Sequence, residues 1–301
     1  MLKSRIAKVI AVLALFCVVL PVAAAPEKEE ETKADNVFVI KAVDDLPAEF
    51  LQTDRNRGRI ERPLKDALQK LPEGYSLKVT IGRFFDQGHG HSTGKLEPYV
   101  ANYVAVNPDG EEDGIGASFS DKIRLVKNTT WKNGVKHGVE TLYNGWPHYK
   151  IAEIPWKNGV IEGVKKTFYE DGSLQSETPY VNGEPHGLSK SYAKNGDVTR
   201  QCMLKNGERD GELVDYWPET GNKRREINYD MGKVVGTAKK YYANGQLKQA
   251  IPFKDNVMHG EEKRFTEDGE AESSRYWWNG DYVSKTEFLL KQEYPGYPGA
   301  L

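Results

Sequence analysis

Cysteine is scarce in this chain of 301 residues, in which only Cys17 and Cys202 occur. Cys17 lies in an N-terminal segment that we expect to be removed, and a single remaining cysteine cannot form an intramolecular disulfide. Cys202 falls on the inward side of a predicted strand, where a small buried apolar residue is a more ordinary role than a nucleophile. We therefore do not expect disulfides to hold this fold together.

Apolar residues and net charge are also low. Hydrophobic residues make up 38% of the chain, and the formal net charge is -2. The low apolar content suits a thin sheet with a one-sided core better than a deep globule. The near-neutral charge gives no general electrostatic reason to expect nucleic acid as a partner.

Catalytic signatures are missing as well. The sequence has no Gly-x-Ser-x-Gly element, Walker-type loop, dinucleotide fingerprint or His-Glu-x-x-His pair. We expect no catalytic residue, no cofactor and no metal. The alternative is an enzyme with its site in residues 37–130, resting on His89 and His91, which with the nearby carboxylate of Asp86 could bind a metal. Because no further ligand set can be identified, we interpret that stretch as a polar glycine-rich loop.

The N-terminus has the pattern of a targeting segment over residues 1–25. Basic residues precede an apolar run of twelve residues, 9–20, and small residues follow it. The run is too short for a standard spanning helix, so we expect export to the periplasm or beyond, with cleavage near Ala24. An uncleaved membrane anchor is the alternative. Residues 26–36 are charged, lack apolar periodicity and indicate a disordered linker.

Glycine, by contrast, is abundant and regularly placed. Two-residue corners recur at intervals of 24 or 25 residues, which indicates a repeat architecture. The corners are Asn133-Gly134, Asn158-Gly159, Asn182-Gly183, Asn206-Gly207, Met231-Gly232, Asp255-Asn256 and Asn279-Gly280. A second glycine follows each of the first six corners after four positions, and an aromatic residue follows that glycine after five. These repeat aromatics are Tyr143, Phe168, Tyr192, Tyr216, Tyr241 and Phe265.

Turn chemistry predicts what each unit forms. Asn-Gly favours the type I′ hairpin turn, because both central residues need positive φ. A second turn follows the aromatic in five copies, for example Asp171-Gly172. The remaining segments are of strand length and alternate in polarity, with Thr178 and Tyr180 predicted on one face and Glu177 on the other. Leu174, the first residue after the turn, is predicted on the Thr178 face.

The predicted fold is mainly β, an elongated single-layer antiparallel sheet of about six stacked β-hairpin repeats over residues 131–283. A small α+β region over residues 37–130 precedes it, in which Pro63–Leu71 has the apolar spacing of a helix starting at proline. Residues 37–40, 77–85 and 99–106 are predicted strands. A cap and flexible tail over residues 284–301 follow the repeats, and Ser284 with Glu287 predicts the start of a short helix.

Binding residues are sought among the aromatics. The repeat aromatics are predicted to form core if a second layer or a curled sheet covers them, and a stacking platform if they are left open. Tyr169, Trp217 and Tyr242 occupy the next position, on the face that is otherwise polar. We therefore predict that these three form an exposed aromatic patch for binding. We call the glycines that follow the first six corners after four positions the second-column glycines. Three histidines directly precede such glycines and are predicted turn or edge residues: His137, His186 and His259.

These residues resemble the MORN-repeat-variant family, and within it the YwqK-type antitoxins. The matching motif is Asn-Gly-x-x-x-Gly-x-x-x-x-Tyr, then Asp-Gly-x-Leu and a trailing aromatic, over roughly Trp131 to Gly280. The resemblance implies stacked hairpins and binding to proteins, and in the wider group to lipid surfaces. It implies no catalytic residues in the repeats.

The sequence therefore predicts an exported, non-enzymatic repeat protein that binds a protein partner, not yet identified, through its sheet. A polysaccharide or cell-wall binder, which uses aromatic stacking, is the first alternative. The antitoxin component of a toxin–antitoxin pair is the second. A membrane surface is a further candidate partner, through the resemblance.

Overall fold

The computed structural model describes residues 37–51, 54–85, 96–120, 122 and 124–297. The predicted targeting segment, the charged linker and the stretch with Asp86, His89 and His91 lie outside the described residues. No helix among the described residues has the length and apolarity needed to cross a membrane.

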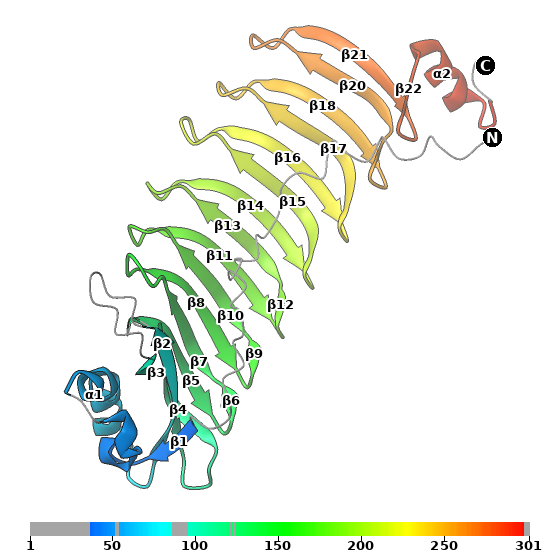
Figure 1. Ribbon diagram of the computed structural model, residues 1–301. Helices are drawn as coiled ribbons and strands as arrows, with labels where there is room; N and C mark the ends of the chain where they lie inside the picture. The colour runs from blue at the N-terminus through cyan, green and yellow to red at the C-terminus, as the bar shows by residue number, and fades with distance from the viewer. Residues whose placement is uncertain (1–36, 52–53, 86–95, 121, 123, 298–301) are drawn as a thin grey trace, which may run out of the picture. The chain divides into compact units, whose positions relative to one another are not determined.

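The described chain forms one antiparallel sheet of 22 strands (Figure 1), which confirms the predicted fold class. The strands are β1 (Val37–Ile40), β2 (Ser76–Phe85), β3 (Leu96–Val106), β4 (Glu112–Phe119), β5 (Leu125–Lys132), β6 (Val135–Lys136), β7 (Gly138–Tyr143), β8 (Lys150–Lys157), β9 (Val160–Ile161), β10 (Gly163–Phe168), β11 (Leu174–Val181), β12 (Glu184–Pro185), β13 (Gly187–Tyr192), β14 (Val198–Lys205), β15 (Glu208–Tyr216), β16 (Lys223–Asp230), β17 (Lys233–Tyr241), β18 (Leu247–Lys254), β19 (Val257–Met258), β20 (Gly260–Phe265), β21 (Ala271–Trp278) and β22 (Asp281–Val283). Longer strands that follow one another in the sequence pair with one another, and β1 and β22 end the sheet. The two-residue strands β6, β9, β12 and β19 pair only with the strand before them, which also pairs with the next long strand.

The corners adopt the predicted hairpin conformation. Asn133 and Gly134 have φ of 49° and 76°, and Asn256 has φ of 71°. Each corner also donates a backbone hydrogen bond to the preceding hairpin, so a column of bonds links one repeat to the next. These bonds run from Gly134 to Glu112, Gly159 to Lys136, Gly183 to Ile161, Gly207 to Pro185, Gly232 to Arg209, Asn256 to Val234 and Gly280 to Met258.

Two features of the structure favour glycine at Gly260, one of the second-column glycines. Gly260 has φ of 127°, where L side chains are strained, and a Cβ there would lie 2.8 Å from the Pro252 ring. Gly260 also pairs with Trp277, the trailing aromatic of the same hairpin. The feature shared by all six repeats is the positive φ, whereas the crowding varies, since a Cβ at Gly236 would meet nothing within 4 Å.

A β-bulge at the second turn corrects the predicted face of the residues around it. In the second hairpin the register shifts between Thr167 and Phe168, so that Phe168 pairs with Leu174. One extra residue moves the side chains beyond it to the other face. Leu174 was predicted to share the face of Thr178, but the bulge places it with Phe168 on the face of Glu177. Strict alternation fails here because of the extra residue, and the sequence pattern does not predict the position of the bulge.

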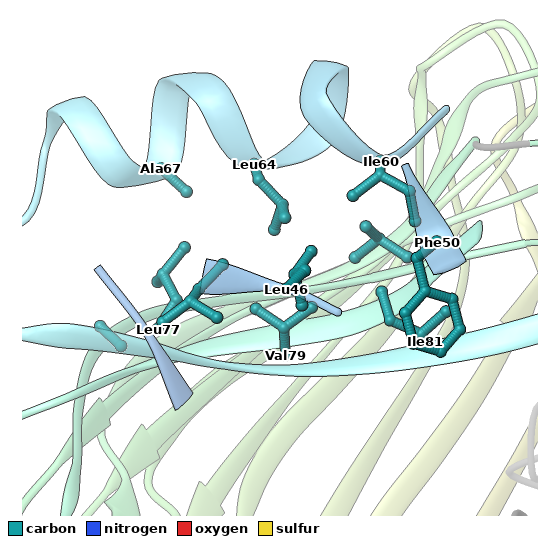
Figure 2. Packing of buried hydrophobic residues seen from close by; sticks show 11 residues of the cluster. Leu46, Phe50, Ile60, Leu64, Ala67, Leu77, Val79 and Ile81 are labelled. Atoms are coloured by element: carbon teal, nitrogen blue, oxygen red, sulfur yellow. The ribbon is translucent and has the colours of Figure 1, made fainter. Parts of the chain in front are cut away.

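The N-terminal region has two layers. Helix α1 (Asp54–Gln69) and two 3-10 turns, η2 (Val43–Asp45) and η3 (Ala48–Phe50), pack on β1–β3. Figure 2 shows Ile60, Leu64 and Ala67 of α1 pointing at Leu77 and Val79 of β2. The helix begins nine residues before the predicted Pro63, which lies inside it.

At the opposite end, α2 (Lys285–Glu293) begins as predicted. Ser284 Oγ accepts a 3.1 Å hydrogen bond from the Glu287 backbone N–H, and this side-chain cap fixes the helix start. Phe288 then packs its ring against Tyr276 and Trp278 of β21.

Candidate binding surfaces of the sheet

The repeats expose two sheet faces. We call face A the side that carries Thr178, Cys202 and Ile227, and face B the side that carries Glu177 and Gln201. Helix α1 lies beside the β1–β3 end and α2 beside the β21–β22 end (Figure 1). Among the described residues, no helix covers the faces of the repeats between them, so both faces can offer surface to a partner.

Face A buries two carboxylates at equivalent places near the two ends of the array. Glu140 is 4% exposed and accepts hydrogen bonds from Lys136 Nζ (2.8 Å), Trp156 Nε1 (3.1 Å) and Thr129 Oγ1 (3.0 Å). Burial alone raises the pKa of Glu140, but the hydrogen bond and charge of Lys136 and the two neutral donors outweigh it and hold the pKa below its ordinary value.

Glu262 repeats this arrangement. It is 2% exposed and accepts bonds of 2.8 Å from Gln249 Nε2, Arg264 Nε and Trp277 Nε1. Burial again acts to raise the pKa of Glu262, and the three donors again lower it further than burial raises it. Trp156 and Trp277, the aromatic residues that come two positions before a corner, therefore donate hydrogen bonds to buried carboxylates. The apolar pattern of the sequence did not predict this role.

One complete cross-strand row of face A is rich in cations. From β14 to β20 it contains Arg200, Asp215, Arg225, Lys240, Gln249 and Arg264 as successive register partners. Asp215 is 1% exposed and pairs with Arg200 (2.5 Å) and Arg225 (2.6 Å). Cys202 lies in the next row, 4% exposed, so its predicted role as a small buried residue is confirmed.

Face B carries the repeat aromatics. Tyr192 donates a hydrogen bond to Glu177 (2.5 Å), and Tyr241 donates one to Glu226 (3.0 Å). Burial and then these carboxylates raise the pKa of Tyr192 and that of Tyr241 to about 12. Tyr216 makes the matching bond to Gln201. The repeat aromatics are half-buried without a second layer, and the hydroxyls of Tyr192, Tyr216 and Tyr241 bind side chains of the preceding hairpin.

Face B also exposes an apolar stripe that the sequence analysis missed. It consists of Val139, Pro155, Val164, Pro179, Leu188 and Met203, paired in register from β7 to β14. Val139, Val164, Leu188 and Met203 are 52%, 42%, 38% and 40% exposed. A signal was present, because the residue after the second-column glycine is apolar in the first three copies and polar in the last three.

The predicted aromatic patch is not an open one. Tyr169, Trp217 and Tyr242 are only half-buried rather than exposed, since their polar atoms bind the next repeat. Tyr169 Oη donates to the Tyr192 carbonyl (2.7 Å), and Tyr242 Oη to the Phe265 carbonyl (2.9 Å). Trp217 Nε1 makes the same contact with the Tyr241 carbonyl (3.3 Å). The three side chains therefore join repeats.

The three repeat histidines do not form a joint site. His186 Nδ1 and His259 Nδ1 lie 3.3 and 3.0 Å from Oδ1 of the next corner asparagine, Asn206 and Asn279. His137 donates its backbone N–H to the Thr130 carbonyl. Within the described residues, no group of three or more His, Cys, Asp or Glu side chains could hold a metal ion.

The first hairpin has one further exposed aromatic that sequence reasoning did not single out. Trp146 is 75% exposed, and the Arg124 guanidinium carbon lies 4.2 Å from its ring centroid. Arg124 and Trp146 line an open depression of about 410 Å³ with Ser120, Lys122 and Gly145.

Comparison with known proteins supports the repeat assignment. The MORN repeat variant family model matches residues 161–182 and 234–255, each of which spans nearly one period of the array. No curated protein matches the chain. MORN repeats point to a repeat protein with a binding role.

Two solved structures with low overall similarity illustrate the comparison with known folds. A mutant of S. aureus TarM, in complex with fondaparinux, α-GlcNAc-glycerol and UDP, is 14% identical with a TM-score of 0.25, over 54% of this chain and 26% of that one. The chain thus spans about a quarter of that structure's length. A porin-like protein from Bacteroides uniformis is 9% identical with a TM-score of 0.17, over 71% of this chain and 94% of that one.

Proposed function

We propose that this chain is a non-enzymatic scaffold that binds a partner protein on face B of its repeat sheet. The exposed apolar stripe carries the proposal. Monomeric proteins rarely expose contiguous apolar patches larger than a few hundred Å², and larger patches mark interaction sites. Six successive side chains of the stripe span about 24 Å at ~4.8 Å per strand, which is enough for a partner to contact several repeats at once.

The row beside the stripe supports an apolar partner surface. Glu153 bonds Lys150 at 2.7 Å, and Glu177 lies 3.8 Å from Lys190. Lys166 lies between Glu153 and Glu177 in the same row, so positive and negative charges alternate along the border of the stripe and largely balance. A partner held there is recognised mainly by apolar contact and shape.

Matched substitutions test the face. Val164 and Thr237 both follow a second-column glycine on face B, but only Val164 belongs to the stripe. Val164→Glu should abolish chemical crosslinking to the partner recovered from the envelope fraction, whereas Thr237→Glu should leave it unchanged. Equal recovery with both variants, at unchanged far-ultraviolet circular dichroism, would reject the stripe as the binding surface.

Export is part of the same proposal, and it is supported by the targeting pattern of residues 1–25. Mass spectrometry of the protein from its native host should find a mature N-terminus near Ala24. An intact Met1 would favour a membrane anchor or the cytoplasmic antitoxin role instead.

A further inference from the structure

Face A holds a surface of a different kind, centred on Lys240. Lys240 is exposed and has Arg225 and Gln249 as its two register partners, and Arg264 follows Gln249. Like charges directly opposite one another on neighbouring strands are destabilising. The sheet nevertheless places Lys240 beside Arg225, and among the described residues no carboxylate forms an ion pair with the Lys240 amine.

The preceding repeat shows what this position can accommodate. Asp215 is the equivalent of Lys240 one period earlier, and it also lies between two register partners, Arg200 and Arg225. There the carboxylate binds both guanidinium groups, at 2.5 and 2.6 Å. At Lys240 the internal carboxylate is replaced by a third cation. The row therefore neutralises its cations with Asp215 in one repeat and has no carboxylate at the equivalent position in the next repeat.

The surrounding charges do not cancel the excess. The buried carboxylate of Glu262 is already occupied by Gln249, Arg264 and Trp277. Lys248 adds a further positive charge near Lys240 and stacks on Tyr242, with its Nζ 4.9 Å from the ring centroid. Partial burial of the amine, and then the charges of Arg225 and Arg264, lower the pKa of Lys240. Asp215 neutralises Arg225 and Glu262 neutralises Arg264, so among the described residues the charge without an ion-pair partner in this row is that of Lys240, with Lys248 beside it.

We propose that the row of Arg225, Lys240 and Arg264 on face A binds an acidic peptide segment of a partner protein. The carboxylate held by Arg200 and Arg225 shows that this row has the spacing to receive such a group. The three cations span about 14 Å across four strands at ~4.8 Å per strand, so a peptide crossing them can present several carboxylates. This inference rests on the proposed binding role, but it uses the opposite face of the sheet.

Adjacent lysines give a matched test. Lys239 and Lys240 are neighbours in β17, but Lys239 lies on face B, where its Nζ is 3.3 Å from Glu226. The probe is a fluorescein-labelled oligo-glutamate peptide, and its anisotropy is titrated with the full chain. Lys240→Gln should raise the Kd about tenfold, equivalent to ~1.4 kcal/mol, whereas Lys239→Gln should change it by less than about twofold. Added salt should weaken binding to the parent protein.

A second variant keeps the test independent of folding. Lys240→Asp places a carboxylate opposite Arg225 in place of a like charge, so it should remove peptide binding while the melting temperature stays equal or rises. Val164→Glu on face B should leave peptide binding intact, which separates failure of this inference from failure of the proposed function.

Three results would overturn the inference. The first is absence of oligo-glutamate binding by the parent protein. The second is equal binding by the Lys239 and Lys240 variants. The third is tighter, Lys240-dependent binding of polygalacturonate or of vesicles containing anionic phosphatidylserine, which would assign the row to a glycan or to a membrane surface.

Discussion

The N-terminal region and the repeats belong to the same sheet but are stabilised in different ways. Under α1, the side chains of Ile60, Leu64 and Leu77 are fully removed from solvent, as in an ordinary two-layer core. In the repeats, where no described helix covers the sheet, the buried groups include Glu140 and Glu262, each satisfied by three donors. The comparison shows that a single-layer sheet can be stabilised by side-chain hydrogen bonds between neighbouring strands where it lacks a deep apolar core.

The largest effect is expected at Asp215. Asp215→Ala leaves Arg200 and Arg225 without the buried carboxylate that neutralises them. Breaking such a pair by removing one partner costs about 3–5 kcal/mol. Denaturant unfolding of the variant measures this loss, and a cost below about 1 kcal/mol would show that the repeats do not depend on their charged networks.

The N-terminal core should respond to loss of apolar volume. Leu64→Ala creates a cavity under α1 and should lower the free energy of unfolding by about 3 kcal/mol. Leu188→Ala, at a leucine that is 38% exposed on face B, should cost less than about 1 kcal/mol because little buried surface is lost. Similar costs at both sites would contradict the two-layer and one-layer distinction.

Acid should weaken the repeats through Glu140 and Glu262. Both pKa values are lower in the folded protein than the ordinary value of 4.5. Their stabilisation is therefore fully present above that value and is lost as the pH falls below it toward the folded pKa values. Melting temperatures measured from neutral pH downward should fall less steeply for a variant with Glu140→Gln and Glu262→Gln. An unchanged slope would assign the acid sensitivity to other groups.

The smallest effect is expected at the bonds that join the second turns. Tyr169→Phe removes the hydroxyl that donates to the Tyr192 carbonyl. One such bond contributes about 1 kcal/mol. Hydrogen exchange should show this loss at the second and third hairpins first, and Tyr282→Phe, at a tyrosine that is 67% exposed, provides the control.

The part of this architecture that depends on local chemistry was predictable. Asn-Gly corners need only their own φ angles, so the hairpins, their period and the antiparallel sheet followed from the sequence. The face of Leu174 did not, because a bulge depends on the pairing of two strands. The start of α1 was missed because Ile60 is the only strongly apolar residue between Asp54 and Pro63. The role of Tyr169 was missed because its acceptor lies one repeat away.

The two strands that end the sheet have a consequence for the behaviour of the molecule in solution. β1 has four residues and pairs only with Leu77–Thr80 of β2, and β22 has three residues and pairs only with Tyr276–Trp278 of β21. The edge continues on β2 and β21, where the charged side chains of Arg83, Glu272 and Arg275 disfavour pairing with a neighbouring copy. Pairing of a strand from another copy with either end of the sheet is therefore disfavoured. Chains at high concentration should stay discrete in length, rather than joining into fibres.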